Sequence, residues 1–145
     1  MFDSSVPRVP LQRSKGSVLA TLPRELTPGT LEQFELDLLE KVRETALSGV
    51  VIDLSALELM DLTEFAKLKR IVQMTQMLGP KIVVVGLRPG VVAGLVALGA
   101  DAAGLTTALN MELGLEVLRA RVSDEALAEA AELPEVLRQA LLGPG

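Results

Sequence analysis

The chain has 145 residues, a length that suits one domain. Its 14 lysines and arginines against 19 aspartates and glutamates give a net charge of −5. Cysteine and histidine are absent, which excludes disulfides, thiol and imidazole catalysis and the usual zinc sites. Because three phenylalanines are the only aromatic residues, a base-stacking platform for single-stranded nucleic acid is excluded as well.

The N-terminal third predicts a leader, a hairpin and a helix. Residues 1–8 are expected to form a flexible leader, and the apolar pieces 9–13 and 18–22 flank Ser14-Lys15-Gly16 as in a β-hairpin. A helix should open at Thr27-Pro28, since proline is favoured in the first helical turn. Within it, Thr30 and Gln33 match a capping box.

The middle of the chain alternates between strands and helices. Gly49 is expected to end the first helix, and Val50–Leu54 follows as a strand buried on both faces. A second helix should begin at Asp61, where Asp61 and Glu64 match a capping box. Lys81–Val85 is the next predicted strand.

The last part predicts a short apolar helix over Val91–Leu98, a strand at Leu105–Thr107 and a helix capped by Asn110 that runs to about residue 121. Residues 122–145 are expected to be an acidic, amphipathic helical tail, which contains five acidic residues and one arginine after Val122. Strand–helix alternation indicates an α/β fold, with a mixed, mostly parallel sheet, helices packed against it and a C-terminal helical extension.

The apolar content, 49% of residues, is high for a small chain. A membrane-spanning helix needs about 20 apolar residues in a row, whereas the best run, Val91–Ala100, has ten. Residues 1–13 lack the apolar segment of a secretory signal. We therefore expect a cytoplasmic protein that uses its surplus apolar surface to form a homo-oligomer and to bind partners.

No catalytic set stands out. Asp53 and Asp61 flank one strand-to-helix loop and could act as paired carboxylates, although a strand-end role and a helix cap explain them better. Ser55 and Thr63 have no histidine to activate them. The glycine-rich turn at residues 86–90 lacks the known phosphate-binding patterns. The sequence thus predicts no enzyme, no cofactor and no metal.

Several motifs together resemble the STAS domain of anti-sigma-factor antagonists, and most nearly the stressosome scaffold proteins of the RsbS type. They are the strand Val50–Leu54 with Ser55, the helix start at Asp61, Leu78-Gly79-Pro80-Lys81, the turn after Val85 and the Leu113-Gly114-Leu115 ending. The resemblance places a STAS domain at residues 9–121, between the leader and the tail.

The resemblance implies a switch without catalysis. Such proteins assemble with sensor STAS paralogues and hold a serine/threonine kinase, which is released when a hydroxyl after the helix-start aspartate is phosphorylated. Here that position holds Leu62, and the family's second acceptor position holds Val85. Thr63 is the only neighbouring hydroxyl, and one helical step turns it by about 100°.

We therefore expect a non-enzymatic stressosome-like scaffold or antagonist. Its switch loop and partner-binding residues would be Asp53, Ser55, Asp61, Leu62, Thr63 and Glu64, with Thr63 as candidate phospho-acceptor. Two alternatives remain, a stand-alone antagonist of an anti-sigma kinase and a module that senses a small molecule or nucleotide through residues 53–63 and 86–90. Neither nucleic acid nor a membrane is an expected partner.

Overall fold

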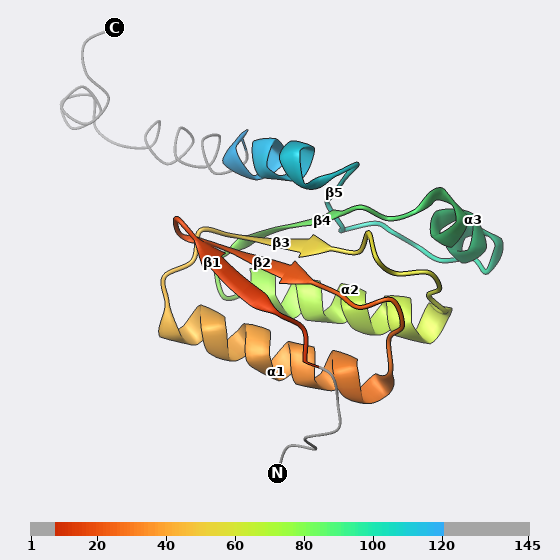
Figure 1. Cartoon of the computed structure of the whole chain (residues 1–145), viewed down its shortest axis with the longest axis horizontal. Helices are drawn as coiled ribbons and strands as arrows, with labels where there is room; N and C mark the ends of the chain where they lie inside the picture. Colours follow the sequence, from red (N-terminus) through yellow and green to blue (C-terminus); the bar gives the residue numbers. More distant parts are fainter. Residues whose placement is uncertain (1–7, 121–145) are drawn as a thin grey trace, which may run out of the picture.

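A computed structural model describes residues 8–120, which form one α/β domain (Figure 1). Residues 1–7 of the expected leader and the whole expected tail, 122–145, lie outside the described residues. Arg8, the last residue of the leader, forms an ion pair with Asp37 on the first helix.

The sheet contains five strands in the order β1-β2-β3-β4-β5. Strands β1 (Leu11–Ser14) and β2 (Ser17–Thr21) are antiparallel, whereas β3 (Gly49–Asp53), β4 (Lys81–Val85) and β5 (Thr107–Ala108) each run parallel to the preceding strand. The sheet is therefore mixed and mostly parallel, as the sequence predicts.

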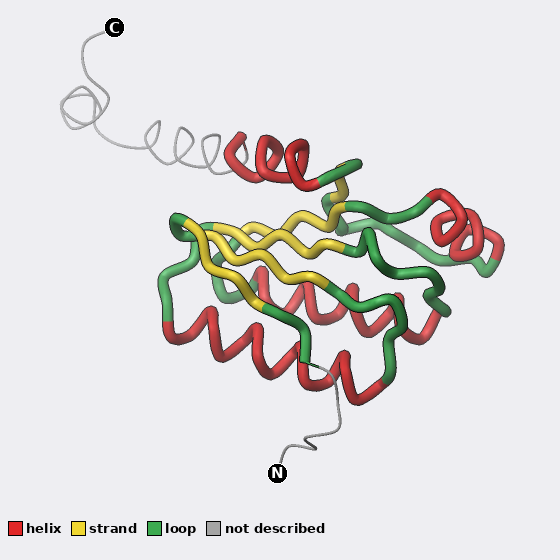
Figure 2. The backbone as a smooth tube through the Cα atoms, in the orientation of Figure 1, coloured by secondary structure: helices red, strands yellow, loops and turns green. Residues whose placement is uncertain are grey.

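Helices cover both faces of the sheet (Figures 1 and 2). Helices α1 (Pro28–Glu44) and α2 (Leu62–Gln76) lie on one face, and a helix over residues 111–120 lies on the other. Helix α3 (Pro89–Ala97) follows β4 and lies at the end of the sheet where the parallel strands finish.

Each face has its own apolar core. The larger cluster joins the inward side chains of the strands, such as Val50, Ile52 and Ile82, to Phe34 of α1 and Leu68 of α2. The smaller cluster joins the opposite face of β3 and β4 to Leu118 on the helix at residues 111–120. Strands buried on both faces explain the continuous apolar runs at residues 50–52 and 82–85.

The structure corrects three local expectations at helix and strand ends. Gly49 begins β3 instead of ending α1, whose last helical residue is Glu44. The cap of α1 is Thr27, which accepts a hydrogen bond from the backbone N–H of Thr30, so Thr30 is not the N-cap residue. Strand β5 starts at Thr107, where the sequence predicts the strand to end.

The hairpin turn is shorter than expected, because Ser14 and Ser17 pair and leave only Lys15 and Gly16 to connect the strands. Both turn residues have positive φ, 48° and 82°. That combination is typical of a type I′ turn, whose twist matches that of the strands. Within residues 8–120, no helix is long and apolar enough to span a bilayer.

Candidate partner-binding site

The expected switch residues lie between the last residue of β3, Asp53, and the first turn of α2, at the end of the sheet where the parallel strands finish (Figure 1). The joining segment is residues 54–61. Leu57 and Met60 anchor this segment in the larger core and are 0% and 7% exposed. Between them, Leu59 is 79% exposed. The two buried side chains thus anchor the loop to the core, and Leu59 between them is exposed to solvent.

Asp53 holds the first turn of this segment. Its carboxylate accepts a hydrogen bond of 2.9 Å from the backbone N–H of Ser55, the local geometry that short acidic side chains favour in turns. The guanidinium of Arg88 donates to the carbonyl oxygen of Ser55 at 2.9 Å. The β3–α2 loop and the β4–α3 turn are therefore joined directly.

Gly86 allows the two loops to come together. Its φ is +78°, and a Cβ atom added there would lie 2.9 Å from Ser55 Cβ and 3.0 Å from the Ser55 backbone nitrogen. The glycine-rich turn thus has a packing role beside the switch segment. Its backbone N–H donates to the Ala108 carbonyl at 3.4 Å, which ties the turn to β5.

Asp61 and Glu64 form the predicted capping box at the start of α2. The N–H of Glu64 donates to the Asp61 carboxylate at 2.7 Å, and the N–H of Asp61 donates to the Glu64 carboxylate at 2.9 Å. Satisfying these end groups stabilises the first turn of the helix. The turn is therefore ordered while its outer side remains accessible.

Leu62 and Thr63 are the first two helical residues after that cap. Leu62 is 39% exposed, so part of its side chain is accessible to a partner. Thr63 is also exposed. An apolar side chain and a hydroxyl are therefore both accessible at the positively polarised end of α2, and one helical step separates their directions by about 100°.

The carboxylates of Asp53 and Asp61 each accept a hydrogen bond from a backbone N–H of their own turn, which matches the strand-end and helix-cap roles expected for them. No cluster of acidic residues suited to a metal ion occurs in residues 8–120. The local bonds account for both aspartates as structural groups.

Sequence reasoning missed two contributors to this site. Leu59 is an apolar residue in a loop, and only the buried positions of Leu57 and Met60 show that it points outward. Arg88 reaches Ser55 across 33 positions in the sequence. A contact between such distant residues leaves no local pattern, although the isolated Leu59 was a signal that could have been read.

The fold and the sequence together place the chain in a family. The STAS domain profile matches residues 8–112, and the chain belongs to the STAS domain family. A serine-to-glutamate variant of RsbS from Moorella thermoacetica is 31% identical, with a TM-score of 0.69, over 79% of this chain and 97% of that one.

Two further structures are similar to the chain. A stressosome structure, described as a signal integration and transduction hub, is 32% identical with a TM-score of 0.66, over 77% of this chain and 96% of that one. The anti-sigma factor antagonist SpoIIAA is 15% identical with a TM-score of 0.61, over 77% and 96%, and shares the fold. The search of curated proteins returned no match.

Proposed function

We propose that this chain is a non-enzymatic STAS scaffold or antagonist of a stressosome-like signalling complex in the cytoplasm. It binds other proteins, namely further copies of itself, sensor STAS paralogues and a serine/threonine switch kinase. The similarity above 30% to RsbS and to a stressosome structure, over nearly the whole of those chains, supports this assignment.

The exposed pair Leu59 and Leu62 at the capped start of α2 is the observation that carries the proposal. Both side chains lie on an ordered surface, so little conformational entropy is lost when a partner covers them. An apolar contact surrounded by polar groups, here Asp61 and Thr63, is the usual composition of a protein interface.

Leu62 stands where the resemblance places the phosphorylated hydroxyl, and it has no oxygen that a kinase could phosphorylate. We infer that the chain binds its partner constitutively. In relatives with a hydroxyl there, a phosphate would add a charge of about −1.5 to −2 beside the docking surface. Leucine instead adds apolar contact area, and burying it fully stabilises a complex by about 1.5–3 kcal/mol.

Incubation with a stressosome switch kinase from the same genome and ATP, followed by mass spectrometry, tests this inference. We expect the wild type to gain no phosphate and Leu62→Ser to gain one. Stoichiometric phosphate on Thr63 of the wild type, lost in Thr63→Val, would show that the acceptor has moved by one residue. A Leu62→Ser protein that stays unmodified would show that the kinase does not dock on this surface.

A further inference from the structure

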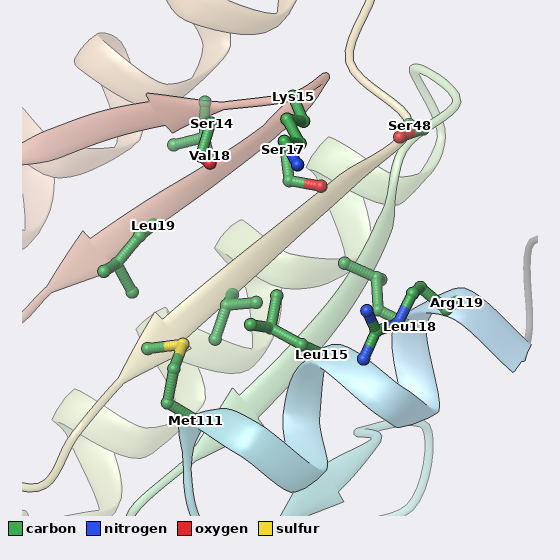
Figure 3. Close-up of a pocket in the computed structure, with 11 residues that line it drawn as sticks. Ser14, Lys15, Ser17, Val18, Leu19, Ser48, Met111, Leu115, Leu118 and Arg119 are labelled. Atoms are coloured by element: carbon green, nitrogen blue, oxygen red, sulfur yellow. The ribbon is translucent and has the colours of Figure 1, made fainter.

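An open groove lies on the sheet face opposite α1 and α2, between β2, β3 and the helix at residues 111–120 (Figure 3). It has a volume of about 620 Å³. Its floor and wall are largely apolar and include Leu19 and Val51 on the strands and Met111, Leu115 and Leu118 on the helix. Leu115 is 37% exposed although it points into this space.

The helix cannot move inward to close the groove, because glycines already bring it close to the sheet. A Cβ added to Gly114 would lie 2.4 Å from Val85 Cγ1, so the helix backbone rests on β4. At the other end of the helix, Leu118 covers Gly49 so closely that a Cβ there would lie 2.3 Å from Leu118 Cδ2. The apolar side chains of the groove next to β2 can therefore be buried only by another segment or molecule.

The charged side chains that line the groove are positive. Among residues 8–120, Lys15 and Arg119 are the charged residues that line it, and three serines complete the polar part of the lining. Figure 3 shows Lys15, Ser48 and Arg119 at one end and Leu19 and Met111 toward the other. An occupant with apolar side chains and carboxylates would match both surfaces.

We propose that this groove is the docking site of the chain's own acidic C-terminal segment, residues 123–142. That segment carries five acidic residues and one arginine, a net charge of −4, and its part before Pro134 has an apolar stripe of Ala126, Ala130 and Leu133 at helical spacing. The described chain ends at residue 120, directly after Arg119 of the groove lining. The segment therefore begins where the complementary charges lie.

The lengths are compatible with this docking. The five residues of β2 span about 17 Å at 3.3 Å per residue. Residues 123–133, which precede the helix-breaking Pro134, span about 17 Å as a helix. After a short turn, this first part of the segment is long enough to cover the groove. Because the segment is tethered, its effective concentration is in the millimolar range, which favours it over a second copy or a dissolved ligand.

The absence of cysteine from the chain makes disulfide trapping a clean test on the full-length protein. Ser17→Cys lines the groove, and Ala126→Cys or Ala130→Cys lies on the apolar stripe of the segment. We expect each pair to form a disulfide within one chain under mild oxidation. The matched control pairs Ala130→Cys with Glu44→Cys, which is exposed on α1 at the opposite face and should not cross-link.

Charge variants test the basis of the docking. Lys15→Glu with Arg119→Glu should slow disulfide formation about tenfold at low salt, because two exposed attractions become repulsions. Adding Glu125→Lys and Glu129→Lys should restore the rate. Circular dichroism of each variant confirms that the domain remains folded.

Three outcomes would overturn the proposal. A disulfide-linked dimer in place of the intramolecular product would assign the groove to the segment of a second copy. Equal trapping by Glu44→Cys would show that the segment samples the surface without a site. A protein that forms neither product, and that carries a small molecule in native mass spectra, would assign the groove to that ligand.

Discussion

Two glycines of opposite character show how single residues fix the switch segment. Gly86 has a positive φ and no space for a side chain beside Ser55, whereas Gly94 lies inside α3 with nothing within 4 Å of an added Cβ. The first glycine is therefore required by its surroundings, and the second only loosens its helix.

Gly86→Ala should lower the free energy of unfolding by at least about 1–2 kcal/mol, the cost of the left-handed conformation alone. Gly94→Ala, the matched control, should raise it by about 0.5–1 kcal/mol. Urea unfolding measures both changes. If Gly86→Ala is as stable as the wild type, the close approach to Ser55 is not a constraint.

Asp37 provides a pH-sensitive contact. Burial alone would raise the pKa of its carboxyl, but the hydrogen bonds from Arg8 and Gln33 outweigh burial and lower it. A pKa that is lower in the folded state means that ionised Asp37 stabilises the protein above its unfolded pKa. This contribution is lost as the pH falls through the folded pKa.

Arg8→Ala should therefore make the stability of the protein less sensitive to acid below about pH 4. Thermal melts between neutral and acidic pH measure the slope for the wild type and the variant. Arg13→Ala, an exposed arginine on β1, serves as the control and should leave the slope unchanged. An unchanged slope in Arg8→Ala would contradict the ion pair as its source.

At the scale of elements, the helix at residues 111–120 depends on close contact with the sheet through Gly114. Gly114→Ala would place its Cβ against Val85, and we expect a loss of about 1–3 kcal/mol from overpacking. Val85→Ala removes the opposing Cγ1. The double variant should therefore lose less free energy of unfolding than the sum of the losses in the two single variants. Strict additivity in urea unfolding would mean that the helix has moved away instead.

The sequence predicted the elements well where the signal was local. Strand β4 was expected at Lys81–Val85, and it has those bounds. The cap by Asn110 was also correct, since its side chain accepts from the Leu113 N–H at 2.9 Å. In both cases the deciding residues are neighbours in the sequence, and the same holds for the capping box of α2.

Prediction failed where the deciding contact was distant. The sequence predicts Gly49 as a helix terminator, but it begins β3, where it pairs with Ser17 and Lys81. Leu118 leaves no room for a side chain there. The candidate site shows the same limit. Asp61 and Leu62 were located correctly at the start of α2, whereas the link from Arg88 to Ser55 depends on how two loops meet.

At the scale of the whole molecule, α3 is the element that least suits an isolated domain. Its sequence, Pro89–Ala97, contains no polar or charged side chain, yet only Val91 and Leu95 are buried. Val92 and Val96 are 41% and 68% exposed. A helix that is apolar all round is normally buried, so this surface indicates contact with another protein.

The charge distribution favours the same conclusion. Because residues 123–145 carry −4 of the total of −5, residues 1–122 carry only −1. Nearly neutral surfaces repel each other weakly. The small net charge of residues 1–122 therefore opposes the approach of two α3 surfaces only weakly.

We therefore expect at least a dimer at micromolar concentration, formed through α3. Val92→Glu with Val96→Glu should give a monomer with an unchanged circular dichroism spectrum, because two charges buried in an interface would be unpaired. Leu36→Glu is the matched control: Leu36 is 53% exposed on α1, outside α3, and the variant should leave the mass unchanged. Light scattering across micromolar concentrations measures all three proteins. A wild-type mass of one chain would contradict self-assembly, and loss of assembly in Leu36→Glu alone would move the interface to α1.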